Sequence, residues 1–592
     1  MLGWSGDDTG YLPNRKDIMS VDIEKSYQRW LSNAIDDMQD DLANMSEEDK
    51  FEAFSTSLSF GTAGLRGFLR PGTNGMNIYT VGQATQGLAN YLKANYKNPS
   101  VAIARDSRNM GWEFVKVCVC VLAANGVKAY YSEDIESTPG LSFSVRELHC
   151  SAGICITASH NPAEYNGYKA YGPDGCQITT KAANAISAEI AKTDVFDDVK
   201  FLNFRDAKDT EFASLIGPEV REAFIDAACA CSVVDDEEQA QKDAANLNVT
   251  YTALHGTGYP EVMEALQRNG FTDLHPVTEQ AEADGNFPTA SYPNPETDEA
   301  LALGLEQAKK NNSDILIATD PDADRVGVEV KHGSDYVHLN GNEIGILLFN
   351  YLCEARSARG DALNNLVMVT TIVSSDIVDQ IANYHNIEER RVLTGFKYIG
   401  EQILHLEEDD EKYRFMFGFE ESCGYLAGTH VRDKDGISAC LLIAQMAAMY
   451  KAQGKDLVDV LEDIYKQFGY YKNGVVSVEY PGVEGQEKMA EVLANIRKNP
   501  PKEYCGKKVV ASKDYKKDNK MLVLNGNENS PDEALPKSDV LEYSLEGGSK
   551  VIVRPSGTEP KIKVYCFANA SSEQQSQSLL DKFKESANDL LG

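Results

Sequence analysis

The segment Ile315-Leu-Ile-Ala-Thr-Asp-Pro-Asp-Ala-Asp-Arg325 decides how the rest of the chain is interpreted. Its first half is apolar and rich in β-branched residues, which is typical of a buried strand. Its second half carries Asp320, Asp322 and Asp324 at alternate positions, and Pro321 between them disfavours a helix. The segment therefore predicts a strand that runs straight into a loop of three carboxylates.

Carboxylates two residues apart in an extended loop can converge on one cation. Three oxygen ligands without histidine or cysteine suit magnesium better than zinc. A calcium EF-hand loop also begins Asp-x-Asp-x-Asp, but Arg325 stands where that loop needs glycine and Lys331 where it needs a bidentate glutamate. A solvated acidic turn remains the alternative when this segment is considered alone.

Strand-like and helix-like segments alternate on both sides of this loop. Residues 101–104 and 153–157 have the pattern of strands, and residues 112–124 and 181–192 that of helices. The same alternation returns between residues 248 and 373. This order is the signature of an α/β fold.

The C-terminal part differs, because several short strand-like segments precede one final helix-like segment at 572–591, which predicts an α+β unit. A length of 592 residues corresponds to about four domains at roughly 150 residues each. Polar, turn-rich stretches mark the joins. We therefore expect three α/β domains at 1–208, 209–334 and 335–470, and an α+β domain at 471–592.

Composition limits the possible partners. The chain has 91 acidic and 57 basic residues and a formal net charge of −34, which would repel nucleic acid and anionic lipid. No apolar stretch approaches the roughly 20 residues that span a bilayer. Residues 1–14 lack the basic start and apolar run of a secretory signal, and the twelve cysteines form no Cys-x-x-Cys pair. We expect a cytoplasmic protein with no nucleic-acid or membrane partner.

A second strand-to-loop segment is Gly153-Ile-Cys-Ile-Thr-Ala-Ser-His-Asn-Pro162, which places Ser159 at its tip. A serine hydrolase would show Gly-x-Ser-x-Gly, which is absent here. A phosphoryl carrier needs only an exposed hydroxyl, a metal and nearby cations. A Ser/Asn turn that caps the strand is the competing interpretation.

Three further segments carry candidate ligands. In Val553-Arg-Pro-Ser-Gly-Thr-Glu-Pro-Lys561, arginine can grip a phosphate bidentately while hydroxyls and an amide close around it, although a simple β-turn also fits. Gly418-Phe-Glu-Glu-Ser-Cys-Gly424 and His430-Val-Arg-Asp-Lys-Asp-Gly436 could contact sugar hydroxyls or transfer protons, although a charged surface loop explains them about as well. No Walker A motif is present, so the phosphoryl donor should be the serine or the sugar itself.

In this order, and together with Phe60-Gly-Thr-Ala-Gly-Leu-Arg-Gly67, these segments resemble the signatures of the α-D-phosphohexomutase family. The resemblance runs from about residue 57 to 567. It implies four domains around a central cleft, each contributing one loop. It also implies that Ser159 is a phosphoserine and binds the metal together with Asp320, Asp322 and Asp324.

The remaining site residues follow from the same resemblance. The acid/base and charge-stabilising positions are Arg66, His160, Lys169 and Lys434, without a decision on which of them takes the proton. Arg325 lies beside the metal ligands. The positions expected near the sugar are Thr394, Gly395, Lys397, Glu420 and Ser422, and those expected around the non-reacting phosphate are Arg554, Ser556, Gly557, Thr558 and Lys563. Arg325, and His430 and Arg432 in the segment 430–436, are further substrate-binding candidates that their own segments suggest.

The implied reaction cycle transfers the phosphoryl group from the serine to a sugar hydroxyl and takes the other phosphate back from the bisphosphate intermediate. Mg²⁺ and a glucose 1,6-bisphosphate primer are the expected cofactors, and a small phosphosugar is the expected partner of a monomer or weak dimer. The stretch Glu420-Glu-Ser422 resembles the glucose-type signature. Pentose or mannose phosphates, bisphosphate synthesis, and a non-enzymatic phosphosugar-binding role are the alternatives.

Overall fold

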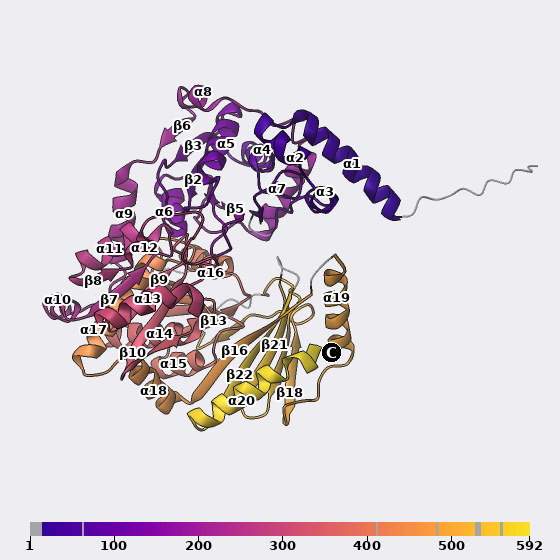
Figure 1. The fold of residues 1–592 in the computed structure, drawn as a ribbon. Coiled ribbons are helices and arrows are strands. Elements are labelled where there is room, and N and C mark those ends of the chain that lie inside the picture. The colour runs from indigo at the N-terminus through magenta and orange to yellow at the C-terminus, as the bar shows by residue number, and fades with distance from the viewer. Residues whose placement is uncertain are drawn as a thin grey trace, which may run out of the picture.

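The computed structural model describes residues 15–61, 64–409, 413–480, 483–526, 534–556 and 561–591. Four β-sheets follow one another along this part of the chain (Figure 1). The first three mix parallel and antiparallel strands and are flanked by helices, and the fourth is antiparallel throughout. The predicted succession of three α/β units and one α+β unit is confirmed.

The first sheet has the strand order β1-β5-β4-β2-β3-β6. Its strands are β1 (Gly64–Phe68), β2 (Ser100–Arg105), β3 (Lys128–Tyr131), β4 (Ala152–Ile156), β5 (Tyr165–Tyr171) and β6 (Ala213–Leu215). Its helices are α4 (Ile78–Asn95), α5 (Gly111–Ala124), α6 (Thr138–Glu147), α7 (Thr180–Lys192) and α8 (Phe204–Lys208). Because β6 pairs with β3, this sheet extends past the boundary expected at residue 208.

The second sheet has the order β11-β10-β9-β7-β8 and is formed by β7 (Asn248–Thr252), β8 (Asp273–Pro276), β9 (Ile315–Thr319), β10 (Val326–His332) and β11 (Asp335–Leu339). Its helices are α9 (Pro218–Cys229), α10 (Glu237–Ala245), α11 (Gly258–Arg268), α12 (Thr278–Ala281) and α13 (Asp298–Asn311). The hairpin partner β11 lies beyond the boundary expected at residue 334, so this sheet continues to Leu339.

The third sheet has the order β15-β14-β12-β13-β19 and is formed by β12 (Leu366–Thr371), β13 (Glu388–Val392), β14 (Arg414–Glu420), β15 (Gly424–Ala427) and β19 (Leu522–Leu524). Its helices are α14 (Gly341–Ala358), α15 (Ile377–His385), α16 (Phe396–Asp409), α17 (Gly436–Ala452) and α18 (Leu457–Phe468). The strand β19 comes from the C-terminal part of the chain, where we expected it to join the last domain. It pairs with β13 instead and covers an otherwise open sheet edge.

These three sheets share one topology. In each, a central strand (β2, β7 or β12) has a parallel neighbour on either side, and the second of these turns back into an antiparallel strand. The three turns β4–β5, β9–β10 and β14–β15 are therefore equivalent positions of the fold. Each contains a non-glycine residue with positive φ, namely Ser159 (53°), Ala323 (54°) and Cys423 (59°), which is uncommon.

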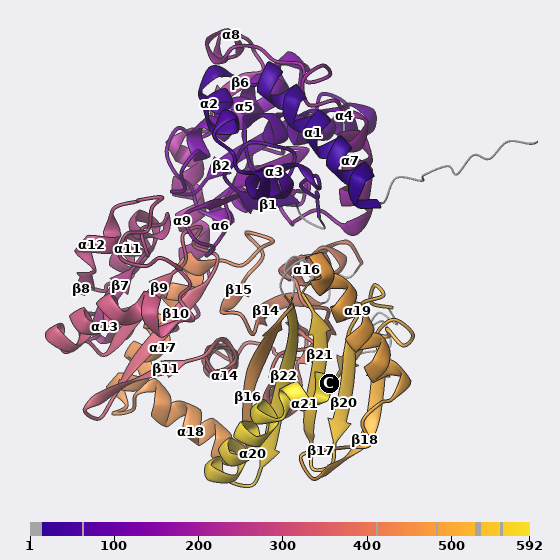
Figure 2. The same cartoon turned by 45° about the vertical axis from the view of Figure 1, so that its right-hand side comes forward.

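The fourth sheet has the order β16-β22-β21-β20-β18-β17. Its strands are β16 (Tyr470–Glu479), β17 (Glu503–Tyr504), β18 (Lys507–Asp514), β20 (Leu541–Leu545), β21 (Ser549–Pro555) and β22 (Lys561–Ala570). Three helices belong to this unit, namely α19 (Val483–Lys498), α20 (Glu573–Glu585) and α21 (Ala587–Leu591). Figure 2 shows α20 running across β16 and β22, which it contacts.

Three helices precede the first sheet, namely α1 (Arg15–Asn33), α2 (Asp36–Ala43) and α3 (Glu47–Phe54). The indole of Trp30 packs edge-on against Phe54, Tyr79 and Phe196 at centroid distances of 6.1, 5.4 and 5.2 Å. Arg29 also forms a salt bridge with Asp194 at 2.6 Å. These contacts attach the N-terminal helices to the first α/β unit.

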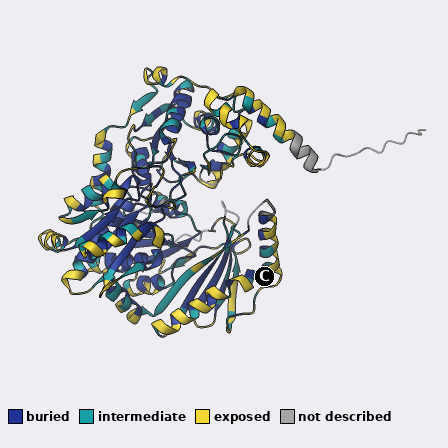
Figure 3. Ribbon diagram, viewed as in Figure 1, coloured by how far each residue is buried: buried dark blue, intermediate teal, exposed yellow. Residues whose placement is uncertain are grey.

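One continuous cluster of buried apolar side chains runs through the second and third units, and Figure 3 shows many of their strands in the dark blue of buried residues. The helix α17 carries an apolar stretch around residues 441–449, and its residues Leu441 and Ile443 have no exposed surface. The helix has apolar residues on all its faces, as expected for a helix that is covered on all sides. Among the described helices, none combines the length and apolar character needed to cross a bilayer.

Substitution Leu441→Ala should lower the free energy of unfolding by about 2–5 kcal/mol, because it removes buried methyl groups and leaves a cavity in α17. Urea unfolding followed by circular dichroism measures this change. The control Val510→Ala, at a side chain that is 66% exposed on β18, should shift the free energy by less than about 0.5 kcal/mol. Equal effects of the two substitutions would contradict the assignment of α17 to the core.

Candidate active site

Ser159 lies in the turn between β4 and β5 and points at the metal-binding loop of the second unit. Its Oγ donates a hydrogen bond to Asp320 Oδ2 at 2.7 Å and lies 3.2 Å from His160 Nδ1. Its backbone N–H donates to Thr157 Oγ1 at 2.8 Å, which fixes the positive-φ turn. Two segments more than 150 residues apart in sequence therefore place a nucleophilic hydroxyl against a carboxylate.

Arg108 supports this turn through hydrogen bonds, and no sequence motif points to this residue. The side chain is 2% exposed, and its two terminal nitrogens donate to four backbone carbonyl oxygens of the turn. These belong to Ser159, Asn161, Pro162 and Tyr165. The guanidinium therefore fixes the backbone from the nucleophile to Tyr165.

Asp106 completes this support. Its Oδ2 accepts from Thr157 Oγ1 at 2.6 Å and lies 3.3 Å from Arg108 Nε, and its Oδ1 accepts from the backbone N–H of Arg108 at 2.9 Å. Burial raises the pKa of Asp106 to about 6, against the opposing effect of Arg108. The only signal in the sequence is Asp106-Ser-Arg108 directly after β2, a polar pair at a strand end.

The three aspartates converge as predicted. Their carboxylates are buried, and one oxygen from each lies within 4.8 Å of the others. Asp320 Oδ1 accepts from the backbone N–H groups of Asp324 at 3.1 Å and Arg325 at 3.0 Å, which curls the loop around this carboxylate. The loop geometry is thus set by the first aspartate.

Lysines from two other units reach these carboxylates. Lys169 on β5 lies 2.6 Å from Asp322 Oδ2 and 3.3 Å from Asp324 Oδ2. Lys434, just before α17, lies 3.0 Å from the same Asp324 oxygen. Thr138 Oγ1 donates to Asp322 Oδ2 at 2.7 Å. The negative cluster is therefore offset by cations from the first and third units.

The donor set fits a magnesium ion. Within the described residues, Asp322 Oδ1 and Asp324 Oδ1 are buried oxygens that accept no hydrogen bond. Burial and the neighbouring Asp322 raise the pKa of Asp320 well above its usual value. Burial alone would raise the pKa of Asp324. Lys434 and Lys169 oppose this effect and together hold the pKa of Asp324 below its usual value. Three carboxylates and a serine oxygen are hard ligands of the kind that Mg²⁺ prefers.

Other expected site residues surround this centre. Arg66 on β1 donates from Nη1 to Asn161 Oδ1 at 3.2 Å, so it lies beside the Ser159 turn. Arg325 Nη1 pairs with Glu296 at 3.0 Å. Burial lowers the pKa of His160 well below its usual value, and Arg325 adds to this effect. Both effects favour the neutral form of the imidazole next to Ser159.

Two of the expected sugar-contacting residues lie where β14 turns into β15: Glu420 ends β14, and Ser422 lies in the turn. Glu420 is 5% exposed, and its Oε1 accepts the backbone N–H of Gly395 at 2.6 Å. The backbone N–H of Val326 donates to Cys423 O at 2.9 Å, which ties this turn to the metal-binding loop. The two predicted sugar-contacting loops are thereby joined to each other, and one of them is joined to the metal site.

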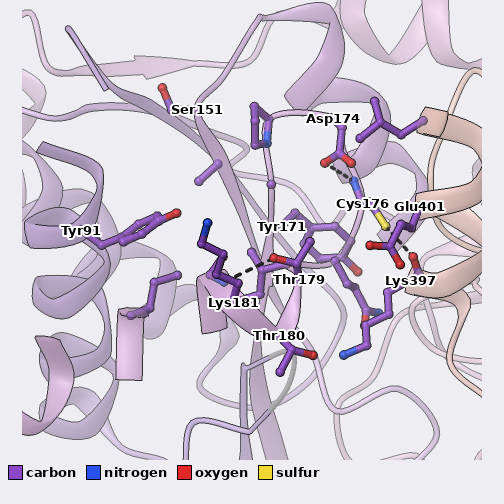
Figure 4. A pocket seen from close by; sticks show the side chains of 18 of the residues that line it. Tyr91, Ser151, Tyr171, Asp174, Cys176, Thr179, Thr180, Lys181, Lys397 and Glu401 are labelled. Atoms are coloured by element: carbon purple, nitrogen blue, oxygen red, sulfur yellow. Dashed lines mark hydrogen bonds between the residues drawn. The ribbon is translucent and has the colours of Figure 1, made fainter. Parts of the chain in front are cut away.

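A pocket of about 610 Å³ lies between the first and third units, and Lys397, two residues after Gly395, lines it. Figure 4 shows Lys397 extending from α16 toward Thr180, with Tyr91 and Lys181 on the opposite side. In the described part of the chain, the buried Nζ of Lys397 and Oγ1 of Thr394 have no hydrogen-bond partner. Lys397 lines this pocket, so its ammonium group is the one of the two that faces a possible ligand there.

Two basic residues of the fourth unit lie near the turn β14–β15. Arg554 on β21 stands opposite Lys563 on β22, and Arg554 Nη1 donates to Tyr565 Oη at 3.5 Å. Burial and the neighbouring Glu420 raise the pKa of Glu421 to about 7, while Arg554 and Lys563 oppose this shift. The two cations therefore lie within electrostatic reach of the turn β14–β15.

The predicted phosphate loop is only partly described. Ser556 donates its backbone N–H to Lys561 O at 2.8 Å, which closes the hairpin between β21 and β22. Gly557 and Thr558 lie outside the described residues.

Two predicted substrate ligands have other contacts. His430 Nε2 bonds Asp435 at 2.8 Å, and its ring stacks on Phe224 at 6.2 Å. Arg432 is 1% exposed, and its terminal nitrogens bind Glu407 and the backbone carbonyls of Thr429 and Val431. These side chains join structural elements to one another, and the structure does not support their assignment as substrate ligands.

Comparison with known proteins assigns the same four units. The descriptions "Phosphoglucomutase/phosphomannomutase, alpha/beta/alpha domain I", "domain II" and "domain III" match residues 57–196, 222–333 and 340–468. The description "Phosphoglucomutase/phosphomannomutase, C-terminal domain" matches residues 493–586.

Similar curated proteins include two staphylococcal ones, both named phosphoglucomutase. The protein of Staphylococcus epidermidis RP62A is 38% identical over 534 residues, covering 89% of this chain and 94% of its own. The protein of Staphylococcus aureus MSSA476 is 37% identical over 544 residues, covering 90% of this chain and 94% of its own.

Solved structures support the fold. A Thermus thermophilus structure titled a putative phosphomannomutase has a TM-score of 0.66 at 21% identity, covering 90% of this chain and 99% of its own. The open form of parafusin, a phosphoglucomutase from Paramecium, has a TM-score of 0.67 at 17% identity, covering 90% and 95%. With the identity and coverage of the curated relatives, these matches show that the chain belongs to the phosphoglucomutase/phosphomannomutase family, the α-D-phosphohexomutases.

Proposed function

We propose that this enzyme interconverts glucose 1-phosphate and glucose 6-phosphate through a phosphorylated Ser159 and a glucose 1,6-bisphosphate intermediate. The observation that carries the proposal is the 2.7 Å hydrogen bond from Ser159 Oγ to Asp320 Oδ2, inside a buried cluster of three carboxylates. The relatives at 37–38% identity that are named phosphoglucomutase support the choice of glucose.

The aspartates and Ser159 would hold Mg²⁺, which supplies positive charge that offsets the charge of the transferring phosphoryl group. Lys169 and Lys434 add two cations within 3.3 Å of the carboxylates. Arg66 lies beside the turn that carries the serine. A phosphoryl group on Ser159 would therefore face several positive charges, which is what a loose, charge-spread transition state requires.

The opposite end of the substrate would bind the fourth unit. Arg554 and Lys563, which face each other on β21 and β22, would bind the non-reacting phosphate. Glu420 and Lys397 would contact the sugar between its two ends. Since the phosphoryl group leaves from one carbon and returns from another, the bisphosphate must turn over between the two transfers. The same groups must then accept either phosphate.

We further propose that the enzyme works in the cytoplasm as a monomer or weak dimer, with domains close to 1–208, 209–334, 335–470 and 471–592. The net charge of −34 supports solubility and leaves the basic groups of the site as a local attraction for anionic sugars. Because β6 pairs with β3 and β11 pairs with β10, the first two boundaries are better placed a few residues toward the C-terminus.

Initial rates on glucose 1-phosphate, mannose 1-phosphate and ribose 1-phosphate test the substrate assignment. We expect kcat/KM for glucose 1-phosphate to exceed both others by at least about 10-fold, because a misplaced hydroxyl leaves a buried polar partner unpaired. Assays run with glucose 1,6-bisphosphate present remove differences in priming. A higher kcat/KM for ribose 1-phosphate would overturn the glucose assignment.

Asp322→Asn should lower kcat by at least about 100-fold, since it removes one anionic ligand from the site while keeping the shape of the side chain. Treatment of the wild type with a chelator should abolish activity, and added Mg²⁺ should restore it. Thermal unfolding checks that the variant folds. Wild-type kcat in Asp322→Asn, or full activity in excess chelator, would contradict the metal site.

Arg108→Lys should lower kcat by about 10–100-fold with little change in KM, because one ammonium cannot satisfy the four carbonyl groups that position the Ser159 turn. The matched control is Arg105→Lys at the end of β2, whose guanidinium bonds two carbonyl groups among the described residues, those of Asp106 and Glu133. Its kcat should stay near the wild-type value. A rise in KM without loss of kcat in Arg108→Lys would contradict a positioning role.

A further inference from the structure

Cys231 lies just beyond the end of α9, outside the site described above. Its Sγ is 3.6 Å from His430 Nδ1, and His430 Nε2 is 2.8 Å from Asp435 Oδ2. A nucleophile, a base and an orienting carboxylate thus stand in one row, which is the arrangement of an activated nucleophile. Since Nε2 faces a carboxylate and carries a proton, Nδ1 is the atom that can take the thiol proton.

Two groups that can carry positive charge, His430 and Arg356, lie near the Cys231 sulfur. Burial lowers the pKa of His430, but Cys231 and Asp435 raise it to about 10, so an imidazolium formed when Nδ1 takes the thiol proton is stabilised here. Burial also lowers the pKa of Arg356, while the Cys231 sulfur lies close enough to oppose that shift. The carbonyl oxygens of Ala427 at 2.9 Å and Ala227 at 3.6 Å accept from the neutral thiol and act against the thiolate.

Accessibility separates Cys231 from most of the twelve cysteines, all of which the structure describes. Nine are buried, and only Cys229, Cys231 and Cys505 are partly exposed. Cys229 Sγ accepts from Asn269, and burial raises its pKa. Cys505 Sγ faces the carbonyl of Lys582. Of these three thiols, Cys231 alone has a described contact with an imidazole.

We propose that Cys231 is a reactive thiol, activated by His430 and Asp435, and is a site of covalent modification by peroxides and small electrophiles. The thiol proton passes to His430 Nδ1, and the thiolate attacks one peroxide oxygen as the O–O bond breaks. His430 returns its proton to the departing hydroxide. The balance is one thiol plus hydrogen peroxide giving one sulfenic acid plus water.

Modification at this position should reach the active site through the loop 428–436. A Cβ built at Gly428 would lie 3.1 Å from Cys231 Sγ, so a group added to the sulfur has little room on this side and displaces the loop. Asp435 donates its backbone N–H to Tyr425 O at 2.8 Å, and Gly436 donates to Ala323 O at 3.1 Å. Lys434, between His430 and Gly436, contacts Asp324 at 3.0 Å.

Limited alkylation of the full-length protein with iodoacetamide at pH 7, followed by peptide mass mapping, tests the reactivity. We expect Cys231 to react at least about 10-fold faster than Cys505 and Cys229, because only the thiolate is nucleophilic. In His430→Gln the Cys231 rate should fall to that of Cys505, while the Cys505 rate stays unchanged and so serves as an internal control. An equal rate for Cys231 and Cys505 in the wild type, or no change in His430→Gln, overturns the proposal.

Hydrogen peroxide with dimedone as the trapping reagent tests the oxidation step. We expect a dimedone adduct on Cys231 and, without dimedone, a loss of mutase activity that dithiothreitol reverses. Cys231→Ser should keep the untreated activity and lose this sensitivity, since serine preserves the shape of the side chain. Equal peroxide sensitivity in Cys231→Ser overturns the link to the active site, whatever the sugar specificity of the enzyme.

Discussion

The structure depends on one electrostatic constraint, which is the burial of three carboxylates in a single loop. Asp320, Asp322 and Asp324 are at most 2% exposed, and like charges at this depth repel strongly unless cations offset them. The loop belongs to the second unit, but Lys169 comes from the first and Lys434 from the third. Balancing this charge therefore requires the three α/β units to come together, and the site exists only in the assembled fold.

The shared topology explains why the functional loops meet. Ser159, Ala323 and Cys423 occupy equivalent turns of three similar sheets, and each has a positive φ that L-residues rarely adopt. In the first unit this conformation is held by Arg108 and Thr157, which bond the backbone on both sides of the serine. The same turn, repeated three times, thus presents Ser159, the loop of three aspartates and the segment Glu420-Glu-Ser422.

The sequence predicts much of this site because its segments join a recognisable strand to a chemically distinctive turn. The aspartate triplet and the Ser159 turn lie where the pattern predicts. Asp106 and Arg108 could not be found in this way, since their role depends on four carbonyl groups whose positions appear only in three dimensions. The segment 430–436 predicts a ligand role for His430 and Arg432, but in the structure their side chains bond other structural elements. The pairing of β19 with β13 is a long-range choice of sheet edge that local pattern does not encode.

The central claim is that Ser159 carries the phosphoryl group, and the intact mass of the purified enzyme tests it most directly. The account predicts a species about 80 Da heavier than the unmodified chain, with the added group mapping to Ser159 and lost on incubation with excess glucose 1-phosphate. Ser159→Ala should lack this species and should not turn over. A phosphoryl group mapped to another residue, or wild-type turnover in Ser159→Ala, would contradict the account.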